Sequence, residues 1–200
     1  MIYIEGNIGV GKTTLLNALI KYNLHVITEP VEKWVDILEL YYGNKQKYAF
    51  LFQMKILLSW IDKIMLIDNS NVYFTERSLL SGKEIFFYQT CKENLVNEDN
   101  IKEYNDCFDQ LTSIDFIKKI IKPTAYIYLK APPEICYQRI KKRNRQGEEH
   151  ITLEYLQTLD LHHQVWLKKQ MEKGVKVLEI DNSEELCVDK MYQKILSLLI

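Results

Sequence analysis

The stretch GNIGVGKT, residues 6–13, fits the pattern G-x-x-x-x-G-K-[ST] and decides the fold class. It follows an apolar run at residues 1–5 and precedes a helical pattern. Glycines let backbone N–H groups converge on phosphate oxygens, and a helix that starts near Thr13 directs its dipole at the same anion. Lys12 would neutralise phosphate charge, and the Thr13 hydroxyl would bind Mg²⁺. The alternative is an ordinary strand-to-helix turn that happens to contain glycines. The full match to the motif between a strand and a helix instead predicts a nucleoside triphosphate site.

The rest of the chain alternates short apolar runs with longer helical patterns. Strands are expected at residues 1–5, 24–28, 72–75, 125–129 and 175–180, each apolar on both faces or nearly so. Apolar residues at three- and four-residue spacing predict helices over about 48–67, 101–121 and 153–171. A last helix is expected after Ser183, a candidate N-cap, and the polar stretch 92–100 is expected as a surface loop. This alternation predicts an α/β fold: a doubly wound, five-stranded parallel sheet flanked by helices.

Composition excludes several classes of protein. The 200 residues, 47% hydrophobic and 26% charged, predict a single domain over 1–200. A net charge of -1 argues against a nucleic-acid coat. No run of about 18 uncharged apolar residues is present, so no membrane partner is expected. The four cysteines lack CxxC spacing and no leader precedes the motif, which together favour reduced thiols and a cytoplasmic location.

Two acidic clusters follow the second and third expected strands. Glu29 opens the segment EPVEKW at 29–34, and Glu76 and Arg77 belong to the segment ERS at 76–78. Ligands bind at the carboxyl ends of strands in open α/β sheets. A carboxylate there can accept a proton from a hydroxyl nucleophile, and an arginine can hold phosphoryl charge. Isolated residues of this kind are often helix caps or surface pairs, but their place beside a phosphate loop favours catalysis.

A basic segment precedes two glutamates in the second half of the chain. Arginines and lysines crowd residues 139–145, and Glu148 and Glu149 follow. Such a run is often a solvated face or a nucleic-acid patch. In an acidic chain with a nucleotide site, we interpret residues 139–150 as a basic lid over the triphosphate, because arginine stabilises transferring phosphoryl charge.

Taken in order, these segments resemble the deoxynucleoside kinases. The resemblance rests on residues 4–14, 29–34, 76–78 and 139–156, with His163 and Trp166-Leu167 beyond them. It covers nearly the whole chain and implies a P-loop kinase fold. It also implies ATP-dependent phosphorylation of a deoxynucleoside 5′-hydroxyl in nucleotide salvage, Mg²⁺ as cofactor, and a homodimer built from helices.

The resemblance implies a role for each matching residue. Glu29 would take the 5′-hydroxyl proton, with Arg77 beside it, and Glu76 would join Thr13 at the metal. Lys12 would act on the transferring phosphate. The expected ATP site comprises Gly6, Asn7, Ile8, Gly9, Val10, Gly11, Lys12, Thr13, Thr14, Arg139, Arg143, Arg145, Glu184, Glu185 and Leu186. The expected nucleoside site comprises Glu29, Trp34, Tyr42, Phe52, Gln53, Ile56, Trp60, Arg77, Gly82, Phe86 and Glu149.

Two details of the nucleoside site stay open. Tyr42 and a glutamate would hold the sugar 3′-hydroxyl, and an extra residue at 146–147 leaves a choice between Glu148 and Glu149, of which we favour Glu149. Gln53 would read the base, because an amide carries an acceptor and two donors and by turning over can pair with thymine or cytosine. The purine- and cytidine-preferring relatives have an arginine in place of Trp60 and an aspartate in place of Gly82, so we favour pyrimidines.

Two other functions compete with this interpretation. A thymidylate kinase would need basic residues for the acceptor phosphate near the second strand, where Glu29 and Glu32 stand. A guanine-specific nucleotide switch would be expected to show D-x-x-G and N-K-x-D, and neither motif occurs. His162-His163 lacks metal-ligand spacing, and we expect both histidines on a helix surface.

Overall fold

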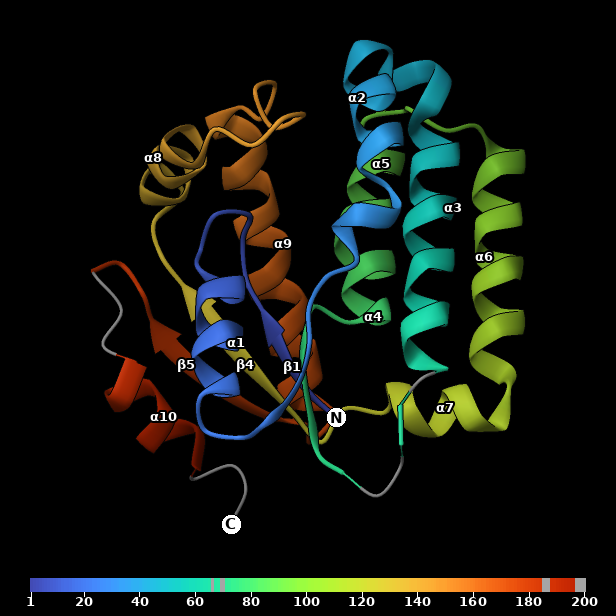
Figure 1. Cartoon of the computed structure of the whole chain (residues 1–200). Helices are drawn as coiled ribbons and strands as arrows, with labels where there is room; N and C mark the ends of the chain where they lie inside the picture. The colour runs from blue at the N-terminus through green and yellow to red at the C-terminus, as the bar shows by residue number, and fades with distance from the viewer. Residues whose placement is uncertain (66, 69–70, 185–187, 197–200) are drawn as a thin grey trace. The chain divides into compact units, whose positions relative to one another are not determined.

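The computed structural model contains a five-stranded parallel sheet, as the sequence predicts. Its strands are β1 (Ile2–Glu5), β2 (His25–Ile27), β3 (Tyr73–Glu76), β4 (Ala125–Lys130) and β5 (Lys176–Asp181). Their order across the sheet is β2-β3-β1-β4-β5 (Figure 1). The central strands β1 and β4 are buried almost throughout, whereas β2 and β5 at the edges are partly exposed because helices cover them incompletely. The expectation of strands buried on both faces therefore holds only for the inner strands.

The structure describes residues 1–65, 67–68, 71–184 and 188–196. Contacts divide the chain into two units, each built from separate stretches of sequence. The first unit contains Met1–Thr28, Ser70–Ser78 and Pro123–Ile200, and thus the whole sheet. The second contains Glu29–Asn69 and Leu79–Lys122.

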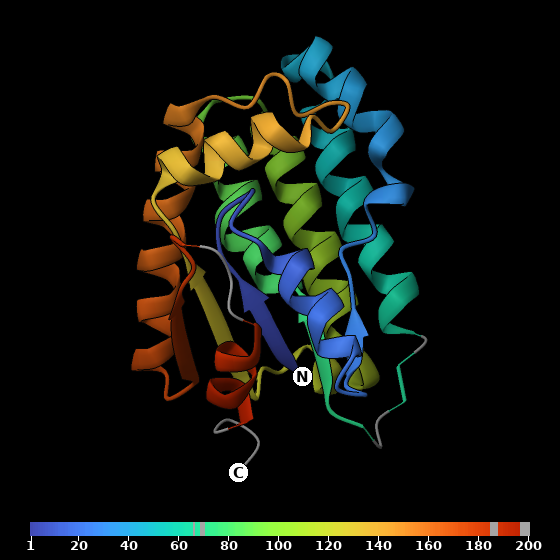
Figure 2. The ribbon, with the colours of Figure 1, turned by 60° about the vertical axis from the view of Figure 1, so that its left-hand side comes forward.

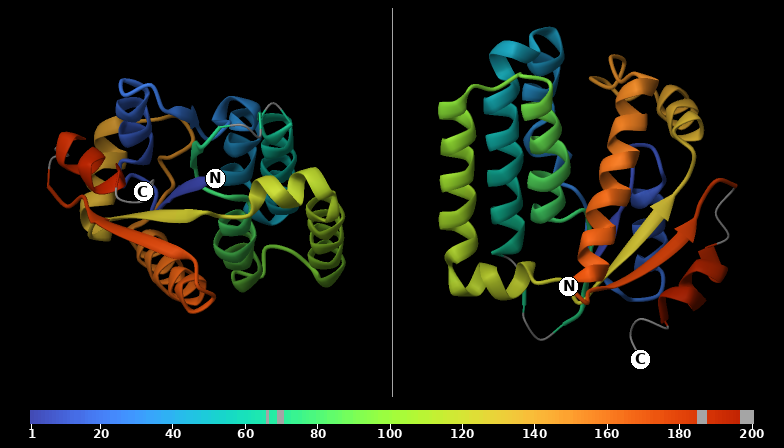
Figure 3. Two further views of the ribbon diagram at one scale, coloured as in Figure 1. Left: turned by 90° about the horizontal axis from the view of Figure 1, so that it is seen from below. Right: turned by 180° about the vertical axis from the view of Figure 1, so that it is seen from behind.

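Helices cover both faces of the sheet in the first unit. They are α1 (Lys12–Ile20), α8 (Pro133–Arg143), α9 (Leu153–Glu172) and α10 (Val188–Leu196). Helices α1 and α9 lie on opposite faces, which confirms the doubly wound arrangement (Figures 1 and 3). Helix α10 packs beside α1, where the rings of Tyr22 and Tyr192 stack with centroids 3.8 Å apart. The chain passes from β4 directly into α8, which packs against α9 (Figure 2).

The start of the last helix differs from the prediction. Described residues place α10 from Val188, so Ser183 is not its N-cap. The backbone N–H of Ser183 instead donates to Oδ1 of Asp181 at 2.8 Å, which closes a turn after β5. By contrast, α9 begins at Leu153 as predicted, because the Thr152 side chain accepts from the backbone N–H of Tyr155.

The second unit consists of helices. They are η1 (Val31–Lys33), α2 (Val35–Gly43), α3 (Lys45–Ile64), α4 (Leu79–Ser81), the π-helix η2 (Gly82–Phe87), α5 (Tyr88–Lys92), α6 (Glu98–Ser113) and α7 (Asp115–Ile121). Helices α3 and α6 run side by side (Figure 1). The Phe87 and Tyr104 rings stack in its core with centroids 3.6 Å apart. Among the described residues, no helix is both long and apolar enough to cross a bilayer.

Helix boundaries in this unit correct three expectations. Helix α3 begins at Lys45, earlier than expected, because the Asn44 side chain caps it by accepting from the Lys47 N–H. The single helix expected over 101–121 is wrong: the extended backbone of Ile114 (ψ 121°) separates α6 from α7. Helix α6 is capped by Asn97 and begins at Glu98, so the predicted surface loop ends earlier than residue 100.

Candidate active site

The loop between β1 and α1 has the conformation that the phosphate-loop motif predicts. Gly9 has a φ of 79°, and a Cβ added there would lie 2.6 Å from the carbonyl oxygen of Cys136. Gly11 has a φ of 104° and stands at the N-cap of α1, where it leaves the first turn without a capping side chain. The side-chain amide of Asn7 donates to the carbonyl of Leu156 at 2.8 Å, which ties the loop to α9. The loop is therefore held open with helix N–H groups at its mouth.

Lys12 lies inside this loop. Its side chain is buried, and Nζ donates to the carbonyl oxygens of Gly6 at 3.2 Å and Asn7 at 2.9 Å. The ammonium thus stands where an anion in the loop would meet it.

A cavity of about 320 Å³ opens beside the loop and has the size of a small-molecule site. Its lining residues come only from the first unit: Gly9, Gly11, Lys12, Thr13, Thr14, Glu76, Arg139, Arg143 and Asn182. The Thr13 hydroxyl lies 3.1 and 3.0 Å from the two carboxylate oxygens of Glu76. The structure therefore brings the two expected metal-binding residues into contact at the wall of the cavity.

Arg77 follows Glu76 in a left-handed backbone conformation. Its φ is 61°, uncommon for a residue with a side chain, and the turn is held because its N–H donates to the carbonyl of Ile4 at 3.0 Å. The Ser78 hydroxyl donates to Glu5 at 2.8 Å. The Arg77 guanidinium is buried and donates to the Gly6 carbonyl at 3.2 Å. The ERS segment is thus fastened to β1 and to the start of the phosphate loop.

His163 corrects the expectation that both histidines lie on a helix surface. His162 is half-buried, but His163 is fully buried on α9. Its Nδ1 lies 2.7 Å from the Leu159 carbonyl, and its Nε2 lies 3.5 Å from Arg77. Because the carbonyl can only accept, Nδ1 carries the proton and Nε2 presents a lone pair to the guanidinium. Burial, and then the Arg77 charge, hold the pKa of His163 well below its usual range.

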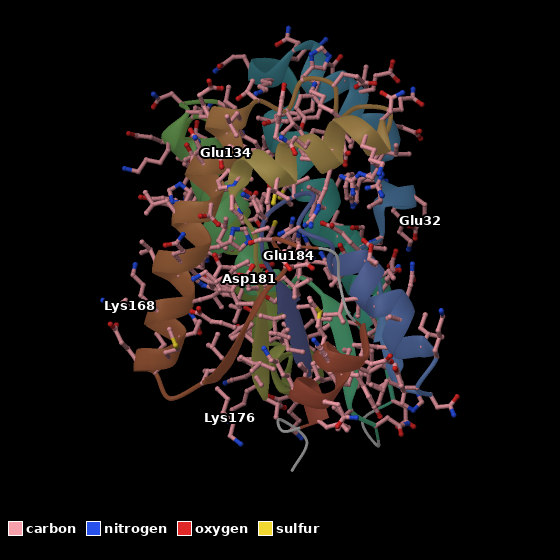
Figure 4. The ribbon with its side chains drawn as sticks, turned by 90° about the vertical axis from the view of Figure 1, so that its left-hand side faces the viewer. Glu32, Glu134, Lys168, Lys176, Asp181 and Glu184 are labelled. Carbon is pink, nitrogen blue, oxygen red and sulfur yellow. The ribbon has the colours of Figure 1, made fainter. Side chains whose placement is uncertain are left out.

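The basic lid predicted over 139–150 contains a helical part and a loop. Arg139 and Arg143 belong to α8, and Arg145 to the loop that follows it. Arg139 donates to the carbonyl of Ser183 at 3.5 Å and to that of Glu184, an expected ATP-site residue, at 3.3 Å. Figure 4 labels Asp181 and Glu184, which flank this turn at the end of β5. The expected ATP-binding residues Glu185 and Leu186 lie outside the described residues.

The two lid glutamates differ in their surroundings. Glu148 is buried, and its two carboxylate oxygens accept from Nη2 of Arg143, each at 2.7 Å. Arg145 lies 3.5 Å from the same carboxylate. Glu149 is exposed, and its carbonyl accepts from Lys141 at 3.1 Å. Glu148 therefore neutralises the lid arginines, while the Glu149 side chain faces solvent.

Asn182 is a cavity residue that sequence analysis missed. It is 3% exposed, and its Nδ2 donates to the carbonyl of Val10 in the phosphate loop at 2.6 Å. Its Oδ1 is buried and accepts no hydrogen bond from the described residues. A buried oxygen of this kind is one that a bound ligand can satisfy. A lone asparagine after an expected strand gives no sequence signal, because turns commonly contain one.

The expected nucleoside residues lie mostly in the second unit. Phe52 is buried there; its ring stacks on Tyr41 with centroids 4.7 Å apart and meets Trp34 edge-on at 5.8 Å. The Trp34 indole N–H is buried without a partner among the described residues. Burial raises the pKa of Tyr41 to about 12. The aromatic cluster therefore carries one unsatisfied donor. Other expected residues of this unit are half-buried (Glu29, Tyr42, Ile56, Gly82 and Phe86) or buried (Trp60).

Gln53 is buried next to Phe52 on α3. Its Nε2 donates to the Thr90 hydroxyl oxygen at 3.0 Å, and Thr90 donates in turn to the carbonyl of Phe86 at 2.9 Å. Among the described residues, Gln53 Oε1 accepts no hydrogen bond. The sequence did not single out Thr90 and Tyr41, because neither residue belongs to a recognisable motif. Only the structure shows that Thr90 contacts Gln53 and that Tyr41 stacks on Phe52.

Comparison with known proteins places this arrangement in a family. The sequence pattern described as deoxynucleoside kinase matches residues 2–199. The chain belongs to the deoxynucleoside kinase family. It is 32% identical to "Thymidine kinase 2, mitochondrial" of Homo sapiens, over 96% of this chain and 75% of that protein. A probable deoxycytidine kinase of fowlpox virus is 32% identical, over 96% of this chain and 83% of that protein. Deoxycytidine kinase 2 of Gallus gallus is 29% identical, over 98% of this chain and 86% of that protein.

Family membership confirms the function class expected from the sequence. This deoxynucleoside kinase is an enzyme that phosphorylates deoxynucleosides for nucleotide salvage, with ATP as the donor that the family uses. The match decides against a thymidylate kinase and against a nucleotide switch. The phosphate loop, the Thr13–Glu76 contact, Arg139 and Arg143 lie together at the cavity.

Proposed function

We propose that this deoxynucleoside kinase acts on pyrimidine deoxynucleosides such as thymidine and deoxycytidine. The observation that carries the proposal is the Gln53 amide, buried beside Phe52 with an acceptor that the described residues leave unused. An amide with one free donor and one free acceptor matches the pairing edge of a pyrimidine. Trp60 and Gly82 bring no charge for a purine or a cytosine, and relatives in the same family are named as thymidine and deoxycytidine kinases.

The first unit supplies the phosphate-donor site in this proposal. The phosphates of ATP would lie in residues 6–14, with Lys12 and the N–H groups of α1 around them. Arg139, Arg143 and Arg145 would hold charge as the γ-phosphate transfers. Glu148 accepts from Nε and Nη2 of Arg143, so Nη1 of the same guanidinium would reach a phosphate oxygen.

Thr13 and Glu76 would bind Mg²⁺. Their hydroxyl and carboxylate oxygens are the hard ligands that this ion prefers, and they already lie in contact. The ion usually keeps several waters and phosphate oxygens, so a pair of protein ligands fits it. Among the described residues, no cluster of three or more His, Cys, Asp or Glu suggests a different metal. When bound, the ion neutralises charge on the transferring phosphoryl group.

Glu29 would act as the base toward the 5′-hydroxyl, and Arg77 would hold phosphoryl charge. A carboxylate after a strand end can accept the hydroxyl proton as the oxygen attacks phosphorus. The structure supports the role of Arg77 through three fixed contacts: the Ile4 and Gly6 carbonyls and His163. Tyr42 and Glu149 would hold the sugar; Glu148 is occupied by Arg143, which supports the choice of Glu149.

A homodimer is part of the proposal. Leu51 and Leu58 on α3 and Met65 at its C-cap stand at seven-residue spacing, and each is at least half exposed (53%, 50% and 58%). An exposed apolar stripe of this length is typical of a helix-packing surface. Light scattering after size-exclusion chromatography tests it: wild type is expected as a dimer and Leu51→Lys/Leu58→Lys as a monomer, whereas a monomeric wild type contradicts it.

The catalytic proposal is tested by phosphate transfer from labelled ATP to the four deoxynucleosides and to thymidylate. We expect transfer to thymidine or deoxycytidine and little to deoxyguanosine. Glu29→Gln should lower kcat by about 100-fold or more with unchanged ATP affinity, because general-base catalysis typically contributes that much. Glu32→Gln is the matched control from the same segment and should retain activity. Normal turnover by Glu29→Gln would overturn the assignment of the base.

A further inference from the structure

The Gln53 amide is held by a chain of two hydrogen bonds. Gln53 on α3 and Thr90 on α5 are both nine-tenths or more buried, and their contact is 3.0 Å between Nε2 and Oγ1. Thr90 also approaches the Phe86 carbonyl at 2.9 Å, one helical turn earlier. These two hydrogen bonds form a chain from Gln53 through Thr90 to Phe86.

The direction of this chain is fixed by the Phe86 carbonyl. A carbonyl oxygen can only accept, so the single hydroxyl proton of Thr90 points to Phe86. Thr90 Oγ1 then offers only lone pairs to Gln53, and the amide must present N–H rather than oxygen. If the amide turned over, its oxygen would face the Thr90 lone pairs, or Thr90 would have to give up Phe86. The end of the glutamine side chain is thereby held in one orientation.

We propose that Thr90 is a specificity-determining residue: by fixing the Gln53 amide in one orientation it makes this enzyme discriminate between deoxycytidine and the 4-oxo pyrimidine deoxynucleosides, such as thymidine. The inference rests on the proposed role of Gln53 as the base-reading residue. Thr90 acts through Gln53 and is a positioning residue rather than a catalytic one.

The discrimination follows from the pairing edges of the two bases. Thymine and uracil present a donor at N3 beside an acceptor at O4, whereas cytosine presents an acceptor at N3 beside a donor at N4. An amide must therefore turn over to pair with positions 3 and 4 of both bases. An amide held in one orientation satisfies one class of base and penalises the other, whereas a freely turning amide accepts both.

A purely structural role for Thr90 makes a different prediction. If the Thr90–Gln53 hydrogen bond only fastens α5 to α3, its loss should lower stability and should change kcat/KM for all nucleosides by the same factor. The ratio between two substrates separates the two roles. Deoxyuridine and deoxycytidine are the best pair, because their bases lack the 5-methyl group and differ at position 4.

The experiment measures kcat/KM for both nucleosides in wild type, Thr90→Val and Thr90→Ser. Wild type should prefer one of the two nucleosides by about tenfold, as expected when one buried hydrogen bond is left unmade with the other. Thr90→Val should bring the ratio close to unity by raising kcat/KM for the disfavoured nucleoside relative to the other, and Thr90→Ser, which keeps the hydroxyl, should retain the wild-type ratio. Thr112→Val is the matched control, since Thr112 also donates to a carbonyl one turn earlier, that of Phe108, at 2.8 Å.

The outcomes separate this inference from the proposed function. Gln53→Leu should lower kcat/KM for both nucleosides; if it changes neither, the base-reading role of Gln53 fails. If Gln53→Leu has its effect but Thr90→Val leaves the ratio unchanged, only the role of Thr90 fails. A wild-type ratio near unity overturns the inference without any variant. Thr90→Ala carries the same expectation as Thr90→Val if the latter does not fold.

Discussion

Replacement of Gly9 by alanine is predicted to destabilise the first unit through two separable effects. Gly9 has a φ of 79°, a conformation that costs a residue with a Cβ about 1–2 kcal/mol. The added Cβ would also lie 2.6 Å from the Cys136 carbonyl oxygen and 2.9 Å from Cγ1 of Ile140. Because the oxygen belongs to the backbone of α8, it cannot rotate away, and overpacking of this kind costs about 1–3 kcal/mol. The sum predicts a loss of about 2–5 kcal/mol in the free energy of unfolding.

Two other glycines separate the contributions. Gly174 has a φ of 82° and no atom within 4 Å of an added Cβ, so Gly174→Ala should show only the conformational cost of about 1–2 kcal/mol. Gly82 has neither the positive φ nor a nearby atom and lies in a helix. Gly82→Ala should therefore be neutral or stabilising by about 0.5–1 kcal/mol.

Urea denaturation followed by circular dichroism measures the series, since a shift of midpoint at constant slope reports a change in stability. The expected order of stability is Gly82→Ala, wild type, Gly174→Ala, Gly9→Ala. If Gly9→Ala unfolds at the same urea concentration as Gly174→Ala, the contact with α8 has no energetic consequence and the steric argument is refuted.

Three further predictions concern the site. Thr13→Ala should raise the Mg²⁺ concentration for half-maximal activity by about tenfold, since it removes one oxygen ligand; an unchanged Mg²⁺ titration would exclude Thr13 from the metal site. Burial and the Arg77 charge lower the pKa of His163, so below about pH 6.5 the unfolded state binds more protons than the folded state. The free energy of unfolding should therefore fall as the pH drops through that value, by at most about 1.4 kcal/mol per pH unit. His163→Gln should reduce this pH dependence of stability. Equal slopes in wild type and variant would contradict this. Burial raises the pKa of Cys136 to about 11, so iodoacetamide at pH 8 should alkylate half-buried Cys107 well before Cys136, as peptide mass spectrometry can show; similar rates would contradict the burial of that thiol.

The parts of the fold that follow from local periodicity could be predicted from the sequence. The buried strands β1 and β4 are short apolar runs, too short for a typical helix, and the helix over 153–172 repeats apolar residues at three- and four-residue spacing. The break at Ile114 could not be predicted, because apolar spacing continues across it and only the backbone conformation changes. No helix was predicted over residues 79–92, where the structure has α4, the π-helix η2 and α5.

Site residues differ in the same way. Lys12 and Thr13 could be placed in the phosphate loop because the motif fixes their types and spacing, whereas Glu76 was expected at the metal only from the family resemblance. His163 and Asn182 could not, because each acts on a residue more than 80 positions away in the chain, at separations that no local pattern records. Long-range hydrogen bonds of this kind become visible only when the sheet is assembled.

The bond from Asn182 to Val10 joins the two ends of the first unit and has a thermodynamic consequence. The phosphate loop near the N-terminus receives part of its support from the segment that leaves the edge strand β5, 172 positions later. By linkage, a nucleotide that binds better when this support is present must also tighten the attachment of β5 to the sheet. Occupancy of the loop should then protect the β5 amides from hydrogen exchange, and a newly made chain should acquire full nucleotide affinity only after its last strand has docked.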